Sequence, residues 1–391
     1  MRTQIAVVLL SAGLASASVW SADGDLDPSF ANQGTYLIKA DPGDELPFGT
    51  APKLVTASSG VYTMYTRQHN NKFIRRITRL SGSGELSGHV DLDYLDQIYA
   101  SSYFETLAVD NTGRIYVAGG ASLLNNGDML VCRLKSDGTP DASWGGNAGC
   151  TTISFDLVLN GNDFATAIHL LADGRVLVAG HVAVGANIYT MAAARIDQNG
   201  NWDVSFGQGG KYYSSTSKTK AVDIDVDPSG RIFLGGNLDV DGCNSDMFVQ
   251  RLSANGLMQA SRIIKWDIGA NCDGKKDWLS GIHALPDGSV WVSGGGRVDS
   301  TGGWKLCTAK LTSDNLLLDG SYNGTGKTQQ FVCDVCQYSE ISSSAVQSDG
   351  KMLVAGTTDI GGGTYELFFS RINAGGQSDY SLFSILDYPQ K

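Results

Sequence analysis

The sequence has few of the residues that would place it in several protein classes. It holds only 8 prolines, 7 cysteines and 5 histidines among 391 residues, and 29 Lys and Arg against 40 Asp and Glu. The net charge of −11 repels phosphate backbones and anionic lipid headgroups, so nucleic acid is not an expected partner. No apolar run is long enough to span a bilayer, so no membrane insertion is expected.

Common catalytic motifs are also missing. The chain contains neither the G-x-S-x-G of serine hydrolases nor the G-x-x-x-x-G-K-[ST] of phosphate-binding loops. Glycine, in contrast, is abundant, with 49 residues, beside 13 Phe, 15 Tyr and 7 Trp. Many glycines together with many aromatic residues indicate a folded protein rich in turns.

The N-terminal segment has the layout of a secretory signal peptide. An apolar run over 5–14 follows a basic residue, and Ala15-Ser16-Ala17 forms an A-x-A cleavage site. The run is too short to cross a bilayer. The sequence therefore predicts a signal peptide over 1–17, with cleavage after Ala22 as the alternative, and export to the periplasm or the extracellular space.

The cysteines fit an oxidising compartment. They fall in three clusters, which predict the local disulfides Cys132–Cys150, Cys243–Cys272, and Cys307 with Cys333 or Cys336. The C-x-x-C spacing of the last two also suits zinc or a redox pair. Zinc would need a second pair of ligands nearby, and none has the right spacing, so a structural disulfide is favoured and one cysteine stays unassigned.

One motif, D-G-R-x-x-V-A-G, recurs along the chain. Its marker glycines are Gly60, Gly113, Gly174, Gly230, Gly288 and Gly350. A basic residue followed by Leu or Ile and a turn comes after each copy, as in Arg195-Ile196. A third motif, D-x-S-F-G-x-x-G, is clearest at Asp203–Gly210. Repeats of this length indicate a solenoid or propeller.

Each repeat contains four short strand patterns separated by turns. In the third repeat they cover 166–171, 175–180, 192–196 and 210–214. Four antiparallel strands per repeat are typical of a propeller blade. The predicted fold is therefore an all-β, six-bladed β-propeller over residues 18–391. The blades are expected to start near residues 51, 104, 163, 219, 278 and 339.

A surplus copy of the third motif precedes the first blade, over 25–38. It predicts that the strand Thr35–Ile38 pairs into the last blade and closes the ring. The last tail, 377–391, lacks the G-x-x-G, so it is either displaced or shares that blade. A seventh, partial blade is the alternative.

The three motifs together resemble the delta-60 repeat family of bacterial β-propeller proteins. The resemblance covers essentially the whole mature chain and is clearest over 113–149 and 174–210. It implies an exported propeller and carries no general activity. It also implies that the repeat residues are structural, among them Asp128 and Asp246, each five residues before a motif arginine.

Chemistry is therefore sought where the repeat is broken. The position five residues before each marker glycine reads Val55, Ala108, His169, Asp225, His283 and Ala345. If this first strand is innermost, His169, Asp225 and His283 come from three consecutive blades at one level, with Asp223 on the same strand face as Asp225. Two imidazoles and a carboxylate can hold a metal or position a general base. Channel residues solvated by water are the structural alternative.

A second candidate is a loop with alternating oxygen donors. Its residues Asp239, Asp241, Asn244 and Asp246 could wrap calcium, although the bidentate Glu of an EF-hand is missing. Asx turns are the ordinary alternative. The acidic runs 91–96 and 267–277 are interpreted as solvated connectors. Trp266, Trp278 and Trp304 would stack on sugars or peptides if exposed, and are core residues if buried.

Two functions remain as expectations. The first is a non-catalytic exported propeller, a monomer, that binds protein or glycan through one face. The alternative is a metal-assisted hydrolase or lyase that uses the channel residues. No cofactor is assigned, and a divalent metal such as calcium is the candidate.

Overall fold

The computed structural model describes residues 5–8, 35–38, 44–45, 53–70, 72–93, 101–123, 126–269, 275–298, 304–331, 338–347, 349–359 and 365–386. The chain divides into two compact units. Unit 1 contains Asp25–Val178 and Ala194–Asp203, and unit 2 contains Ala179–Ala193 and Val204–Lys391. None of the helices in the described residues is long and apolar enough to cross a membrane.

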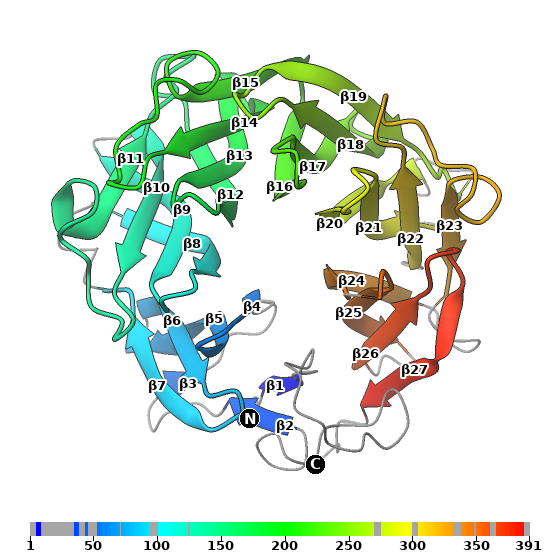
Figure 1. The fold of residues 1–391 in the computed structure, drawn as a ribbon, viewed down its shortest axis with the longest axis horizontal. Helices are drawn as coiled ribbons and strands as arrows, with labels where there is room; N and C mark the ends of the chain where they lie inside the picture. The colour runs from blue at the N-terminus through cyan, green and yellow to red at the C-terminus, as the bar shows by residue number, and fades with distance from the viewer. Residues whose placement is uncertain are drawn as a thin grey trace. The chain divides into compact units, whose positions relative to one another are not determined.

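Within the described residues the strands form six antiparallel sheets in chain order, and a separate pair (Figure 1). This is the predicted fold class, an all-β six-bladed β-propeller with mostly four-stranded blades. The first strands of the six sheets are β4 (Lys53–Ala57), β8 (Ser101–Val109), β12 (Asp163–Leu170), β16 (Thr219–Val226), β20 (Asp277–Ala284) and β24 (Tyr338–Val346).

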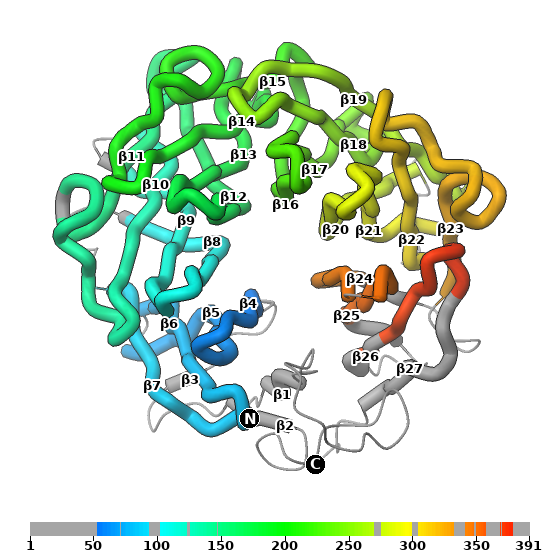
Figure 2. Tube along the Cα trace, viewed as in Figure 1, coloured from blue at the N-terminus to red at the C-terminus, as the bar shows by residue number. Residues whose placement is uncertain are grey.

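The remaining strands follow in sequence, as the chain path in Figure 2 shows. The second strands are β5 (Gly60–His69), β9 (Ile115–Leu123), β13 (Val176–Gly185), β17 (Ile232–Asp239), β21 (Val290–Arg297) and β25 (Met352–Asp359). The third strands are β6 (Lys72–Leu80), β10 (Asn126–Leu134), β14 (Ile188–Ile196), β18 (Ser245–Leu252), β22 (Trp304–Leu311) and β26 (Tyr365–Ile372). The fourth strands are β7 (Leu86–Asp91), β11 (Cys150–Ile153), β15 (Lys211–Ser217), β19 (Met258–Ile264), β23 (Lys327–Gln330) and β27 (Ser378–Leu386).

Five of the marker glycines lie in the turns between first and second strands, and Gly60 is the first residue of β5. Gly174 has φ +85° and donates its N–H to Leu171 O at 2.9 Å, and Gly230 has φ +83° and donates to Asp227 O. Glycine adopts this left-handed conformation without the steric cost that a Cβ brings. The turn therefore explains why a glycine recurs at this place in each repeat.

The aromatic residue of the third motif, D-x-S-F-G-x-x-G, packs against the neighbouring sheet. It contacts the glycine in the turn after the third strand of that sheet. Trp144 in unit 1 is fully buried, and a Cβ on Gly200 would lie 2.8 Å from its ring. In unit 2 the buried ring of Phe206 meets Gly256 in the same way, at 2.6 Å. A backbone hydrogen bond of 2.8 Å accompanies each contact, from Gly145 N to Asn199 O in the first case. The motif is thus structural, as the family resemblance implies.

The closing segment was expected to include the strand 35–38. β2 (Thr35–Ile38) pairs with β1 (Ile5–Val8), which lies within the predicted signal peptide. The last tail forms β27, which pairs with β26 as the fourth strand of the last sheet. Closure of the ring by the segment 25–38 stays a prediction. Most of the predicted signal peptide, residues 1–4 and 9–17, lies outside the described residues.

Candidate functional site

The first strands of successive sheets share a β-bulge and a common register. The register shifts between Phe104 and Thr106 in β8, and the same shift recurs in β16, β20 and β24. After the bulge, Asp225 pairs with Phe233 and His283 with Trp291. The predicted column of residues therefore does lie on equivalent positions of edge strands.

Asp223 and Asp225 use their carboxylates to bind the edge of the neighbouring first strand. Asp223 Oδ2 accepts a hydrogen bond from Ile282 N at 3.0 Å, and Asp225 Oδ2 accepts one from Ala284 N at 2.8 Å. Burial raises the pKa of Asp223, against the attraction of His283. Both carboxylates thus satisfy N–H groups of β20 that its own sheet leaves unpaired.

His283 continues this chain of contacts to the next first strand. Its Nε2 lies 2.8 Å from Ser344 Oγ on β24, and Ser344 Oγ lies 2.7 Å from Ser293 Oγ. Ser280 Oγ donates to Ile341 O at 2.9 Å. The polar residues of β16, β20 and β24 therefore connect three blades of unit 2 through hydrogen bonds.

The structure brings together Asp223, Asp225 and His283 within unit 2. His169 lies on β12 in unit 1, where its side chain is half-buried. Across the described residues, no three His, Cys, Asp or Glu side chains are placed to hold a metal ion. Within unit 2, the hydrogen bonds of Asp223, Asp225 and His283 connect neighbouring first strands. A general-base role for these residues stays a prediction.

The predicted calcium loop contains Asx turns. Asp239 Oδ1 accepts from Gly242 N at 2.8 Å, and Asp241 Oδ1 accepts from the N–H groups of Cys243 and Asn244. Asp246 is fully buried and faces Lys265, whose Nζ lies 3.1 Å from Asp246 Oδ2. Asp239 and Asp241 therefore form turns, and Asp246 forms an ion pair with Lys265. Among the described residues, Asn244 Oδ1 and both carboxylate oxygens of Asp246 are buried without a hydrogen-bond partner.

Asp277 was missed by the sequence reasoning, which interpreted 267–277 as solvated. It begins β20, is fully buried, and accepts a hydrogen bond from Trp266 N at 2.7 Å. Burial, reinforced by the charges of Asp246 and Asp267, raises the pKa of Asp277 to about 7. Its position at the start of a first strand, where Asp163 stands in an earlier repeat, was the available signal.

Asp91 was also interpreted as solvated, and it too is a structural residue. Its carboxylate accepts from Arg76 Nε at 2.8 Å and from Arg67 Nη2 at 2.6 Å. Burial alone would raise the pKa of Asp91, but the hydrogen bonds from both arginines outweigh burial and lower the pKa to about 2. The acidic run 91–96 therefore begins with the last residue of β7.

A polar cleft in unit 1 was not predicted. It has a volume of about 720 Å³ and lies among the turns that follow β8, β10, β12 and β14. Its lining includes three arginines with their carboxylate neighbours, and the exposed amides of Asn111, Gln198 and Asn199. The arginines and carboxylates are Arg114, Arg133, Arg175, Asp110 and Asp173. Because its residues belong to the repeat motifs, single-sequence reasoning classed them as structural.

Of the predicted disulfides, the structure contains Cys132–Cys150, whose residues face each other across β10 and β11. Cys272 of the second pair lies outside the described residues, as do Cys333 and Cys336. Cys307 is a free thiol, contrary to the prediction, and its side chain is fully buried in the apolar core of unit 2, in a cluster that contains Val292 and Leu279 and, among the described residues, no second cysteine. Burial raises the pKa of this thiol well above its ordinary value.

The tryptophans considered for stacking are largely core residues. Trp304 is only 6% exposed and stacks on half-buried Trp278, with ring centroids 3.7 Å apart. Trp266 is half-buried, with Lys327 Nζ 5.5 Å from its ring centroid. These rings do not form an open platform for sugars or peptides.

Several solved structures are similar to this chain at low sequence identity. The chain is similar in structure to a subtype N10 neuraminidase-like protein from a little yellow-shouldered bat isolate, with 9% identity and a TM-score of 0.50 over 87% of this chain and 96% of that one. Semaphorin 2a of Drosophila matches with 8% identity and a TM-score of 0.43, covering 86% and 68%. The propeller domain of the trilobed protease of Pyrococcus furiosus matches with 10% identity and a TM-score of 0.41, covering 82% and 80%.

The sequence comparisons identify the repeats. No curated protein matches the chain. A family model described as a domain of unknown function (DUF5122) beta-propeller matches residues 111–143, 171–206 and 347–382. These segments cover the best copies of the repeat and one more near the C-terminus. The chain therefore carries DUF5122 β-propeller repeats.

Proposed function

We propose that the protein is an exported, non-catalytic binding module of the delta-60 repeat type, which holds a protein or glycan ligand in the cleft of unit 1. The cleft itself is the observation that carries the proposal. Its volume of about 720 Å³ falls in the range of ligand sites, and hydrogen-bonding groups from four turns converge on it. Loops on a rigid scaffold are where binding residues are concentrated.

A binding role is favoured over catalysis by how the candidate catalytic groups are used. Asp223 and Asp225 each accept a backbone N–H of β20, and His283 contacts Ser344. A general base must reach a substrate proton, whereas these groups are engaged with neighbouring strands. The disulfide Cys132–Cys150, together with the signal-peptide pattern, supports export.

The test is a screen of the mature protein against immobilised glycans and peptides, with a cleft-filling variant, Asn111→Trp, in parallel. Asn111 is exposed on a turn at the cleft, so a large side chain there blocks the space without disturbing the core. We expect a ligand class that wild type binds, that Asn111→Trp loses, and that is recovered chemically unchanged. Equal binding by both proteins, or conversion of the ligand, would overturn the proposal.

A further inference from the structure

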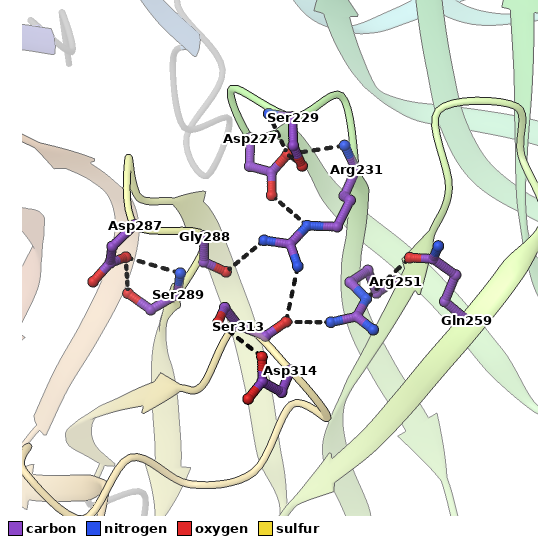
Figure 3. Close-up of polar contacts among 10 residues, drawn as sticks. All are labelled: Asp227, Ser229, Arg231, Arg251, Gln259, Asp287, Gly288, Ser289, Ser313 and Asp314. Atoms are coloured by element: carbon purple, nitrogen blue, oxygen red, sulfur yellow. Dashed lines mark hydrogen bonds and ion pairs between the residues drawn. The ribbon is translucent and has the colours of Figure 1, made fainter.

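Two junctions between neighbouring sheets place an arginine at the same position of the repeat and use it differently. The closed junction, between the β16–β19 and β20–β23 sheets, is shown in Figure 3. There Arg231 donates from Nη1 to Ser313 O at 3.0 Å and from Nη2 to Gly288 O at 3.4 Å. Arg251 donates to the same Ser313 carbonyl. Two guanidinium groups thus fill the space between the turns.

The open junction lies between the β8–β11 sheet and the unit 1 part of the next sheet. Its arginine forms the same local ion pair as Arg231. Arg114 Nε donates to Asp110 Oδ2 at 2.6 Å, as Arg231 Nε donates to Asp227 Oδ2 at 2.6 Å. In the described part of the chain, however, the terminal nitrogens of Arg114 have no partner. The counterparts of Ser313 and Gly288 are Gln198 and Gly174, and both line the cleft. Arg133, the counterpart of Arg251, keeps the corresponding contact and donates from Nη1 to Gln198 O at 3.5 Å. The cleft therefore lies at the place that Arg231 closes in unit 2.

The charges at the open junction are already neutralised within the protein. Burial alone would raise the pKa of Asp110, but hydrogen bonds from Thr112 and Arg114 hold it below its ordinary value. Arg133 pairs with Asp141 at 2.8 Å, and Arg175 pairs with Asp173 at 2.6 Å. Neither an anion nor a cation would find an uncompensated charge, and the net charge of −11 disfavours polyanions.

The groups left for a ligand are hydrogen-bonding groups of both kinds. Donors are the free guanidinium nitrogens of Arg114, and the side-chain amides of Asn111, Gln198 and Asn199 both donate and accept. The hydroxyl group is the ligand group that donates and accepts at once, and sugars carry hydroxyls in adjacent pairs. We infer that the cleft binds an uncharged, hydroxyl-rich glycan, which rests on the proposed binding function and names its ligand class.

A peptide fits this surface less well. Peptide recognition commonly adds a strand to a free sheet edge or places side chains in apolar pockets. The cleft is lined by turns and polar side chains, and Tyr116, its aromatic residue, is only 2% exposed. Without an exposed ring for stacking, binding depends on hydrogen bonds, so we expect dissociation constants of roughly 0.1–1 mM for short oligosaccharides.

The test measures binding of defined hexasaccharides to the full mature protein by ligand-observed NMR. The neutral probes are cello-, malto-, manno- and xylo-oligosaccharides, and the comparison probes are oligogalacturonate and a mixed-sequence hexapeptide. The variants are Arg114→Gln and Asn199→Ala. Asn255→Ala is the matched control, because Asn255 occupies the same turn position in unit 2, outside the cleft. Thermal melts check that each variant is folded.

We expect one neutral oligosaccharide to bind wild type and Asn255→Ala alike, and to bind each cleft variant about tenfold more weakly. Preference for oligogalacturonate or for the peptide, with weaker binding by the cleft variants, would overturn the inference that the ligand is an uncharged glycan. The proposed binding function would still hold. Neutral-glycan binding that the cleft variants do not weaken would overturn both. Both proposals would also be overturned if the cleft variants bound every probe, and every ligand found in the wider screen, as well as wild type does.

Discussion

The open and closed junctions hold neighbouring sheets together by different means. At the open junction, the ring of Trp144 packs under Gly200, and the space above it remains a cleft. At the closed junction the fourth-strand segment lacks the aromatic motif, and Leu316, with φ +54°, stands near the place of the glycine. Arg231 and Arg251 both contact Ser313 O there, whereas at the open junction Arg133, the counterpart of Arg251, contacts Gln198 O without help from Arg114. At the open junction the apolar contact of Trp144 joins the sheets, so the terminal nitrogens of Arg114 remain available to a ligand in the cleft.

The largest effect is expected from removing the apolar contact of the open junction. Trp144→Ala deletes a fully buried ring and should lower the free energy of unfolding by about 3–5 kcal/mol, measured by denaturant titration. The control is Trp202→Ala, which removes a ring that is 37% exposed and should cost clearly less. Equal losses would show that Trp144 does not hold the junction.

The closed junction should also make stability depend on pH through Asp277. Its pKa is raised to about 7, whereas an unfolded Asp titrates near 4, so the folded protein binds a proton that the unfolded chain has released between these pH values. This contribution is complete below about pH 4 and is lost as pH rises through 7, an upper limit of about 4 kcal/mol.

Asp277→Asn keeps an oxygen acceptor for Trp266 N and removes the titration. Free energies of unfolding measured from pH 4 to 8 should fall less steeply for this variant than for wild type. Identical slopes would mean that Asp277 is ionised throughout the range and that another group carries the charge balance at this junction.

Much of the fold follows from the repeat, because its glycines and turns are local features. The expected blade starts at 163 and 219 coincide with the first residues of β12 and β16, and the start at 104 lies three residues inside β8. A positive φ at Gly174 depends on its own turn, so a single sequence indicates it.

The site depends on contacts between distant residues, and the sequence indicated less of it. Arg231 reaches Ser313, 82 residues away, whereas Arg114 makes no such contact among the described residues. Both belong to the same motif, so the pattern alone cannot separate them. Likewise, the repeat placed Asp225 and His283 at equivalent positions of first strands. Their hydrogen bonds to β20 and β24 depend on the distance between adjacent sheets, which the repeat pattern does not contain.

A matched pair of substitutions tests the comparison at the arginines themselves. Arg231→Gln breaks contacts to Ser313 O and Gly288 O and should lower the free energy of unfolding by about 1–3 kcal/mol. Arg114, whose side chain is 40% exposed, makes one local ion pair, and Arg114→Gln should cost less than about 1 kcal/mol. A reversed order would contradict the distinction between the two junctions.

The smallest effect is expected from removing metal ions. We expect the melting temperature to be the same before and after chelation, because the carboxylates of Asp223 and Asp225 already accept backbone hydrogen bonds. The double variant His169→Ala, His283→Ala should lose about 1–2 kcal/mol, part of it through the contact of His283 with Ser344, equally with and without chelator. A stoichiometric transition metal that the double variant loses would favour the hydrolase or lyase instead.

If the open junction is the binding site and the closed junction is structural, a bound ligand should protect only the first of them. Hydrogen–deuterium exchange, measured with and without the oligosaccharide that binds best, distinguishes the two junctions. We expect slower exchange in the turns 110–114 and 171–175, which line the cleft, and no change in the turns 227–231 and 285–289 of the closed junction. Protection confined to the closed junction, or to neither pair of turns, would contradict this expectation.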